Sequence, residues 1–374
     1  MTINSKLISL LDRVKDTKKA TDQETVYLLG LTAPEDIALL FKSARDVRAR
    51  HFNNQVFLYG FLYFSTYCQN NCNFCQFRNS NKNITRYRKS EVEIVDAAKQ
   101  MVTSGVHLVD LTMGEDPELY CYGELGSQKL VHLVKRVSVE TGLPLMLSPG
   151  CIPDKLFASL DLSGVDWYAC YQETHNRQLF KALRPGQDYD IRLENKIRAK
   201  KEGLLIEEGI LVSVGETLYD IAQSIKKMEE LDADQVRAMT FVPHIETPMG
   251  KTAKQGDNST ARSSRRELMT IAVMRLILQD RLIPASLDVD GIEGLKDRLN
   301  AGANVVTSIV PPNKGLSGVA NQTLDIDESR RSRESISPVL KSCNLEIADK
   351  QTYQDWISSR RSRTDSFIQA ACRD

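Results

Sequence analysis

The chain has 374 residues, with 49 basic and 49 acidic side chains, so its formal net charge is zero. That balance argues against a nucleic-acid-binding protein or one held on an anionic membrane, because both use excess positive charge. Hydrophobic residues make up 41% of the sequence, enough for one large barrel domain or two ordinary domains. Eight cysteines in so long a chain do not indicate a disulfide scaffold and fit a reducing cytoplasm. Because we find neither a signal peptide nor an apolar run of membrane-spanning length, we expect a cytoplasmic protein.

The first part of the chain, residues 1–50, predicts an N-terminal helical extension. Apolar residues recur there at the spacing of one helix face, as in Leu7, Leu10, Leu11 and Val14. After this segment the pattern changes, which indicates a second kind of architecture.

Residues 51–325 alternate short apolar runs with longer amphipathic ones. Eight of the short runs are expected to be strands: Val56–Ser65, Leu108–Thr112, Leu143–Ser148, Trp167–Gln172, Gly209–Val214, Val236–Phe241, Ile283–Val289 and Val305–Val310. Helices are expected between them, for example Ser90–Ser104, Leu125–Glu140, Tyr189–Lys201, Leu218–Leu231 and Arg265–Arg281. Such alternation is typical of the α/β class, and eight units favour a closed (β/α)8 TIM barrel over an open sheet.

Polar segments are expected to lie outside the barrel core. Gly250–Arg266 is basic and glycine-containing, and it predicts a mobile surface loop after the sixth strand. Residues 326–374 predict a C-terminal helical segment and polar tail, in which Ser329–Ser335 and Ser358–Arg363 are rich in serine and arginine. Basic runs can bind RNA, but we favour a solvated helix face or a frayed tail.

The strongest chemical signal is a group of three cysteines. Cys68, Cys72 and Cys75 follow the first predicted strand with the spacing C-x3-C-x2-C. Loops that follow barrel strands form the active-site face, so the location suits chemistry. Structural zinc normally uses two C-x2-C pairs, and this segment has only one, with no histidine close in sequence to complete it. A [4Fe–4S] cluster is held by closely spaced thiolates, and three ligands would leave one iron open to chelate a small molecule.

The remaining cysteines are scattered along the chain, at positions 121, 151, 170, 343 and 372. A sulfur-inserting enzyme would need ligands for an auxiliary cluster. We see no such grouping among these five, which argues against that activity.

The motif, with the aromatic Phe74 just before its third cysteine, resembles that of the radical S-adenosylmethionine (SAM) enzymes. The resemblance implies a [4Fe–4S] cluster held by the three thiolates and SAM bound at the open iron. In that superfamily one electron cleaves SAM and yields a 5′-deoxyadenosyl radical, and the protein orients and encloses this chemistry. An electron donor such as flavodoxin or ferredoxin is implied as a partner.

From Cys68 to Asn321 the chain resembles the family of 3-methylornithine synthases, pyrrolysine-biosynthesis mutases of the biotin-synthase-like branch. The matching stretches lie at nearly every predicted strand end: FLYFSTYCQNNCNFC, NITRYR, VDLTMGEDP, LPLMLSPG, ACYQET, VRAMTFVP, RLIPASLDVDGIEG and LNAGANVVTSIVPP. The combination of RLIPASLD with VRAMTF points most specifically to this family.

The resemblance implies a SAM site around the cysteines. The segment MGED after the second strand, with Met113 and Glu115, is expected to support the SAM amino group. Phe74 and Tyr67 are expected to flank the adenine or to pack beneath the cluster.

Charged residues are expected to bind the other end of SAM. Glu173, at the end of the fourth strand, is expected to accept hydrogen bonds from the SAM ammonium group. The alternative is a carboxylate that stabilises a helix N-terminus. Arg192 resembles the arginine that binds the SAM carboxylate, and Arg184 competes for that role.

The implied substrate is L-lysine, which needs a cation for its carboxylate and anions for its ammonium groups. Arg237 lies in an otherwise apolar strand, where a charged group needs a partner. We assign it to the substrate carboxylate, with a structural ion pair as the alternative. Asp110 and Asp288 are candidates for the two ammonium groups, with Ser148 and Ser286 as hydroxyl partners.

The implied reaction is a rearrangement of lysine into (3R)-3-methyl-D-ornithine. Hydrogen abstraction, cleavage between the α and β carbons and recombination would make the enzyme an isomerase, and an enclosed lumen suits a fragmented intermediate. One alternative is another biotin-synthase-like radical SAM enzyme that acts on a different amino-acid-derived substrate. A metal- or redox-sensing protein that uses the three cysteines is a third interpretation.

Overall fold

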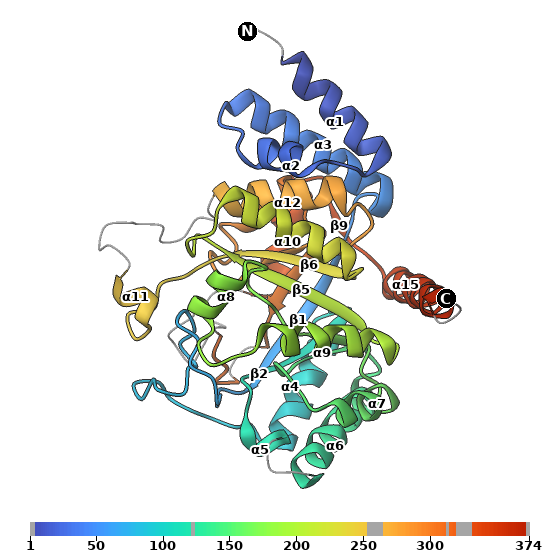
Figure 1. The fold of residues 1–374 in the computed structure, drawn as a ribbon. Helices are drawn as coiled ribbons and strands as arrows, with labels where there is room; N and C mark the ends of the chain where they lie inside the picture. Colours follow the sequence, from blue (N-terminus) through green and yellow to red (C-terminus); the bar gives the residue numbers. More distant parts are fainter. Residues whose placement is uncertain (1–3, 121–123, 253–264, 312–313, 319–330, 372–374) are drawn as a thin grey trace.

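The computed structural model of the chain describes residues 4–120, 124–252, 265–311, 314–318 and 331–371 (Figure 1). Eight parallel strands form a nearly closed barrel: β1 (Gln55–Ser65), β2 (Leu108–Met113), β3 (Leu145–Ser148), β4 (Trp167–Ala169), β5 (Leu205–Val212), β6 (Gln235–Thr240), β7 (Pro284–Ser286) and β8 (Val305–Ile309). Their order is β6-β5-β4-β3-β2-β1-β8-β7. A parallel bridge between Gln235 and Leu282 brings β6 beside the start of β7. The predicted (β/α)8 barrel is therefore confirmed.

The helices of the described chain are α1 (Ser5–Thr17), α2 (Asp22–Leu29), α3 (Pro34–Phe52), α4 (Glu91–Thr103), α5 (Pro117–Tyr120), α6 (Glu124–Thr141), α7 (Asp154–Leu162), α8 (Arg177–Leu183), α9 (Tyr189–Lys201), α10 (Leu218–Glu230), α11 (Pro248–Thr252), α12 (Arg265–Ile277), α13 (Leu295–Asn300), α14 (Arg333–Ser342) and α15 (Lys350–Ala371). Local sequence sets several starts. Ser90 and Glu93 form a capping box at α4, and Thr217 and Asp220 form one at α10. None of these helices is long and apolar enough to cross a membrane.

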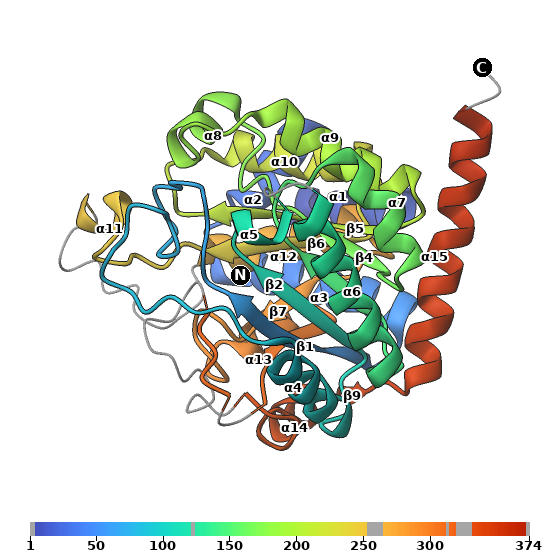
Figure 2. The same cartoon turned by 90° about the horizontal axis from the view of Figure 1, so that it is seen from below.

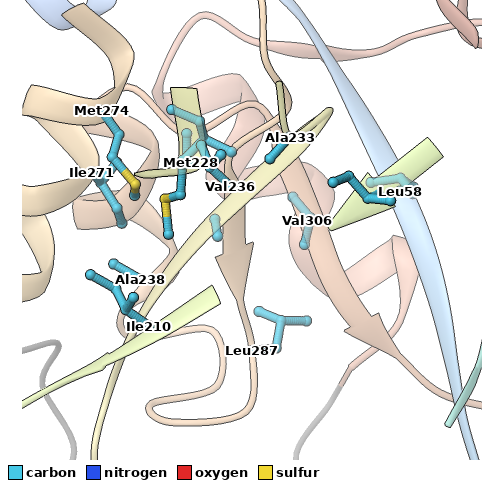
Figure 3. Packing of buried hydrophobic residues seen from close by; sticks show 14 of the residues in the cluster. Leu58, Ile210, Met228, Ala233, Val236, Ala238, Ile271, Met274, Leu287 and Val306 are labelled. Carbon is cyan, nitrogen blue, oxygen red and sulfur yellow. The ribbon is translucent and has the colours of Figure 1, made fainter. Parts of the chain in front are cut away.

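The barrel strands send alternate side chains outward and inward, because successive residues of a strand face opposite sides. Outward-facing Ile210 and Val236 lie on the side of Met228 of α10 and Met274 of α12, whereas outward-facing Leu58 lies beside Val306 of β8 (Figure 3). The N-terminal helices α1 to α3 lie on the outside of this helix layer, against α10 and α12 (Figure 1).

The inward-facing residues form an apolar layer at the N-terminal ends of the strands. It includes Phe57, Tyr59, Leu108, Met146, Trp167, Leu205 and Val305. The long helix α15 covers this end of the barrel (Figure 2). Trp356 stacks on Trp167 with ring centroids 5.8 Å apart, and the hydroxyls of Tyr353 and Tyr59 are 2.7 Å apart. The barrel therefore has a floor closed by apolar and aromatic side chains.

The structure corrects the prediction of a solvated, arginine-rich C-terminal region. Arg331 and Arg360 are each 3% exposed, and both form ion pairs with carboxylates. β9 (Glu346–Ile347), which was not predicted, pairs with β1. Of the predicted loop Gly250–Arg266, residues 253–264 lie outside the described residues, whereas its two ends belong to α11 and α12.

Arg360 should contribute strongly to stability. Its Nη2 atom lies 2.6 Å from Asp234 Oδ1, and both side chains are almost fully buried. Replacing Arg360 with alanine should lower the free energy of unfolding by about 3 kcal/mol, because a buried carboxylate loses its nearest cation. Arg363 of the same helix is a matched control, since its side chain is 60% exposed in its pair with Asp280, and its loss should cost less than about 1 kcal/mol. Urea denaturation of both variants measures the difference, and equal losses would contradict this account.

Candidate active site

A cavity opens at the C-terminal ends of the barrel strands, where loops meet. The cavity has a volume of about 190 Å³ and opens to solvent at its mouth. Among the side chains that line it are Cys68, Cys72, Phe74, Cys75, Met113, Glu115, Ser148, Glu173, Arg184 and Arg192. The predicted cysteines and cofactor residues are therefore brought together in one cavity.

The cysteine loop is folded around a half-buried arginine, Arg86, that the sequence did not single out. The guanidinium of Arg86 donates hydrogen bonds to the backbone carbonyls of Thr66, Phe77, Arg78 and Asn81. Arg86 belongs to the segment NITRYR, and its position explains why that segment accompanies the cysteine motif. The Arg86 guanidinium therefore binds the backbone on both sides of the cysteines, before them at Thr66 and after them from Phe77 to Asn81.

The cysteine side chains fit an iron–sulfur cluster better than a single metal ion. Within the described part of the chain, no three His, Cys, Asp or Glu side chains lie close enough together to hold one ion. Cys72 Sγ accepts hydrogen bonds from Arg184 Nη1 at 3.3 Å and Gln187 Nε2 at 3.1 Å. Such N–H donors to ligand sulfurs are how proteins tune iron–sulfur clusters. Three cysteine sulfurs that line one cavity can each bind a different iron of a cluster.

Burial keeps the free thiols of Cys68 and Cys75 protonated. It raises the pKa of Cys68 to about 11 and also raises the pKa of Cys75, where nearby Cys72 adds to the effect. A coordinating metal centre deprotonates thiols outright. The loop therefore needs such a centre, or the nearby arginines, to hold thiolates.

Two arginine–carboxylate pairs connect the cofactor residues. Arg184 Nη2 lies 2.6 Å from Glu173 Oε1, and Arg192 Nη1 lies 3.0 Å from Glu115 Oε1. Both arginines also donate to the backbone carbonyl of Tyr171, at 3.2 Å and 2.7 Å respectively. This arrangement presents two cations and two anions to the cavity, as a zwitterionic amino-acid ligand requires.

Glu173 is held in an uncommon backbone conformation. Its φ of 68° lies in the left-handed region, which residues other than glycine adopt at a cost, often at functional sites. Burial raises the pKa of its carboxyl group, and Arg184 counteracts that effect. The backbone of Glu173 bonds to Gly209 and Leu211, which fixes the residue beyond the end of β4.

The side chain of Glu115 occupies space that is available because residue 150 is a glycine. A Cβ at Gly150, whose φ is +76°, would come within 2.2 Å of the Glu115 side chain. Burial would raise the pKa of Glu115, but Arg192 and the Cys151 backbone amide outweigh it, and the net pKa is lowered. Glu115 is therefore an anion bound to Arg192.

Tyr67, which was expected to flank the adenine or to pack beneath the cluster, directly precedes Cys68. It is not among the residues that line the cavity. Instead the guanidinium of Arg88 lies over its ring at 3.8 Å, and Arg88 also pairs with Asp116 at 2.7 Å. Phe74 does line the cavity and lies beneath Arg184, 5.2 Å from its guanidinium carbon.

Below the cofactor residues, the barrel lumen contains buried charged groups. Asp110 Oδ1 accepts hydrogen bonds from Ser148 Oγ at 2.8 Å and Thr112 Oγ1 at 3.0 Å. Arg237 Nε donates to Glu207 Oε1 at 2.7 Å, and Arg237 Nη1 donates to Thr307 Oγ1 at 3.3 Å. The structural ion pair considered as an alternative for Arg237 is thus present, and its partner is Glu207.

Asp288 lies just beyond the end of β7, which is shorter than predicted. Its Oδ2 atom accepts a hydrogen bond from Ser308 Oγ at 2.9 Å, and its Oδ1 atom lies 2.6 Å from Arg331 Nη1. Ser286 Oγ accepts the backbone N–H of Asp288 at 3.2 Å. Tyr63, which lines the cavity, lies within electrostatic range of both Asp288 and Asp110. The candidate substrate residues therefore belong to one lumen.

Sequence reasoning missed several of these groups. Glu207 was missed because β5 begins at Leu205, four residues before the predicted start at Gly209. Two adjacent glutamates in an apolar run, LLIEEGILV, were the available signal. Gln187, on a loop, and Arg331, in a polar segment, had no comparable signal.

The cysteines described as scattered include a pair. The thiols of Cys151 and Cys170 are in hydrogen-bond contact, and Arg192 Nη1 lies 3.6 Å from Cys151 Sγ. Burial alone would raise the pKa of Cys170, but the bond from Cys151 and the charges of Arg192 and Lys196 lower it. Because the two loops follow adjacent strands, residues far apart in sequence meet beside the cavity.

Comparison with known proteins agrees with this geometry. A model of the Radical SAM superfamily matches residues 62–228. The 3-methylornithine synthase of Methanosarcina barkeri is 40% identical, over 92% of this chain and 95% of that protein. A crystal structure of methylornithine synthase (PylB) has a TM-score of 0.85 at 40% identity and covers 93% of this chain and 99% of that chain. The [FeFe] hydrogenase maturase subunit HydE of Thermotoga maritima is 32% identical, over 71% of this chain and 74% of that protein.

With three thiols on the loop after β1 and a cavity at the strand ends, the chain is an enzyme of the radical SAM superfamily. Membership implies a [4Fe–4S] cluster and SAM as cofactors, a small-molecule substrate and an electron donor. Within the superfamily, the chain belongs to the family of 3-methylornithine synthases. The family resemblance seen in the sequence is thereby confirmed.

Proposed function

We propose that this enzyme isomerises L-lysine to (3R)-3-methyl-D-ornithine, the first step of pyrrolysine biosynthesis. The supporting observation is a buried set of charges next to the cysteine cavity: Asp110, Glu207, Asp288, Arg237 and Arg331. With Asp110 ionised, this set carries one excess negative charge. Lysine, with two ammonium groups and one carboxylate, carries one excess positive charge. A desolvated site favours a ligand that neutralises it.

The two cofactors are proposed to occupy the upper cavity. Cys68, Cys72 and Cys75 would hold the [4Fe–4S] cluster, and Arg184 and Gln187 would donate hydrogen bonds to its Cys72 ligand. SAM would lie against the remaining predicted cofactor residues: Phe74, Met113, Glu115, Glu173, Arg184 and Arg192. When bound, the pair supplies hydrogen-atom abstraction from an unactivated carbon. The electron donor is expected to be a carrier such as flavodoxin or ferredoxin.

The lumen residues are proposed to bind and orient lysine. Arg237 would bind the carboxylate, while Asp110 with Ser148, and Asp288 with Ser286, would bind the two ammonium groups. Substrate and product are isomers, so no atom is gained or lost. The bond between the α and β carbons breaks, the α carbon bonds to the γ carbon, and the β carbon becomes the methyl group. Charges that bind both ends keep the fragments together, and the closed floor of the barrel excludes water.

Turnover should depend on the protonation of Asp110. Burial and the nearby charge of Glu207 raise its pKa to about 7, above the ordinary value for aspartate. The carboxylate, present above that pH, is the form that binds an ammonium group. We therefore expect kcat/KM for lysine to rise with pH through about 7 and then to level off. An Asp110→Asn variant should lack this pH dependence, and an unchanged profile in the variant would assign it to another group.

The function can be tested by anaerobic reconstitution with iron, sulfide, a reductant and SAM. We expect 5′-deoxyadenosine and a product isomeric with lysine when L-lysine is added, and little of either with L-ornithine. Ornithine is a matched control, because it has the same charges but one methylene less. Release of 5′-deoxyadenosine without any rearrangement of lysine would favour a biotin-synthase-like enzyme with another substrate. Absence of SAM cleavage would favour a metal- or redox-sensing protein.

A further inference from the structure

We propose that Glu207 is a positioning residue for the substrate, because it holds Arg237 and Tyr171 in the arrangement that lysine meets. The proposal rests on the proposed lysine site. Glu207 is fully buried on the lumen side of β5. Its Oε1 atom accepts the Arg237 Nε–H at 2.7 Å, and its Oε2 atom accepts the Tyr171 hydroxyl at 2.8 Å. Both carboxylate oxygens are thus used to orient other side chains.

The bond from Glu207 determines how Arg237 is presented. With Nε turned to Glu207 and Nη1 bonded to Thr307, the planar guanidinium has a fixed orientation. A guanidinium binds a carboxylate best when its plane is held in advance, because less conformational entropy is then lost. Without Glu207, Arg237 would keep its charge, but its guanidinium plane would no longer be held in one orientation.

Tyr171 links this pair to the cofactor residues. Its side chain bonds to Glu207, while its backbone carbonyl accepts hydrogen bonds from Arg184 and Arg192. The ring needs Gly209, since a Cβ at that position would lie 2.9 Å from a ring carbon. A continuous chain of contacts therefore connects Glu207 with both arginines of the SAM site.

The charge of Glu207 also acts on Asp110. After burial, Glu207 is the largest cause of the raised pKa of Asp110, and Arg237 opposes it. Among the described residues, Tyr63 of β1 and Tyr171 after β4 are further titratable groups near Asp110. Ser148 and Thr112, from β3 and β2, donate hydrogen bonds to Asp110 and do not titrate. Removing the charge of Glu207 should therefore lower the pKa of Asp110.

The neighbouring residue, Glu208, provides a matched control. It is also fully buried, but it faces the helix layer, where its Oε2 atom lies 2.7 Å from Lys196 Nζ. Its Oε1 atom accepts the backbone N–H of Gln172 at 2.8 Å. A glutamine at position 207 or at position 208 removes one buried charge from the same strand, but only position 207 faces the lumen.

The test compares Glu207→Gln with Glu208→Gln in the reconstituted enzyme. We expect Glu207→Gln to lower kcat/KM for lysine by about 100-fold, the effect of losing a hydrogen bond to a charged group, mainly through KM. The pH at which kcat/KM rises should move down by about one unit. Glu208→Gln should leave that pH unchanged. Equal losses in both variants, with no shift in pH dependence, would overturn the proposal.

A second readout does not depend on lysine turnover. Infrared spectroscopy can follow the protonated carboxyl band of Asp110, identified by its absence from Asp110→Asn. The band should disappear at a lower pH in Glu207→Gln than in wild type, and an unchanged pH would overturn the proposal. If the band shifts in Glu207→Gln as expected but the wild-type enzyme does not turn over lysine, only the lysine function is contradicted.

A third variant covers the case in which Glu207→Gln does not fold. Glu207→Asp keeps the negative charge but shortens the side chain by one methylene. We expect it to raise KM, because the bond to Arg237 is lost, and to leave the pH dependence in place. An unchanged KM would overturn the positioning role.

Discussion

Replacing Cys72 with alanine should abolish the iron–sulfur cluster and reduce formation of 5′-deoxyadenosine to background. Cys72 is one of the three proposed ligands and is the one that accepts hydrogen bonds from Arg184 and Gln187. With two thiols left, the loop cannot complete the ligand set, because metal-centre stability depends on ligand number and geometry. Iron content and the visible absorbance of the anaerobically reconstituted protein measure the first effect, and chromatography of the nucleoside product measures the second.

Cys343→Ala is the control for this variant. Cys343 is a free, partly exposed cysteine at the C-terminal end of α14, and it does not line the cavity. Its replacement should leave iron content and SAM cleavage at wild-type values. If Cys72→Ala retained a cluster that cleaves SAM, the assignment of the three cysteines would be wrong.

Arg237→Lys should lower kcat/KM for the substrate L-lysine by about 100-fold. The ammonium group of the introduced side chain cannot reproduce the bidentate contact of a guanidinium with the substrate carboxylate. The positive charge is retained, so the buried Glu207 keeps a cation nearby and the fold should be preserved. Cluster content should equal that of wild type. Steady-state kinetics, with iron analysis of the same preparation, separates the loss of substrate binding from a loss of cofactor.

The same substitution at Arg331 tests the orientation of the substrate in the lumen. Arg331 pairs with Asp288 in the same lumen and carries the same charge. We expect Arg331→Lys to lower kcat/KM less than Arg237→Lys does. The opposite order would place the substrate carboxylate near Asp288 and would reverse the proposed orientation of lysine.

The architecture and the cofactor site could be predicted from sequence because both depend on local patterns. Short apolar runs separated by amphipathic segments identify the strands of a parallel barrel, and all eight were found, with errors at their ends. The cysteine motif lies within eight residues and directly follows β1. Since barrel strands end at one face, residues such as Glu173 and Asp110 could be placed near that loop.

The pairing of charges could not be predicted, because it depends on contacts between segments far apart in sequence. Arg331 was predicted to lie in a solvated region, but it contacts Asp288, which is 43 residues away in sequence. Cys151 and Cys170 looked unrelated for the same reason. The error at Glu207 was different: the start of β5 was placed too late, so a buried glutamate was left outside the strand.

Rearrangement of the carbon skeleton of lysine can be followed by the position of one labelled carbon. The most direct measurement is anaerobic turnover of L-lysine labelled with carbon-13 at the β carbon, followed by NMR of the product. We expect 3-methylornithine with the label in its methyl group, because the α carbon moves from the β to the γ carbon. A labelled product with the isotope at another position, or unchanged lysine in the presence of active SAM cleavage, would contradict it.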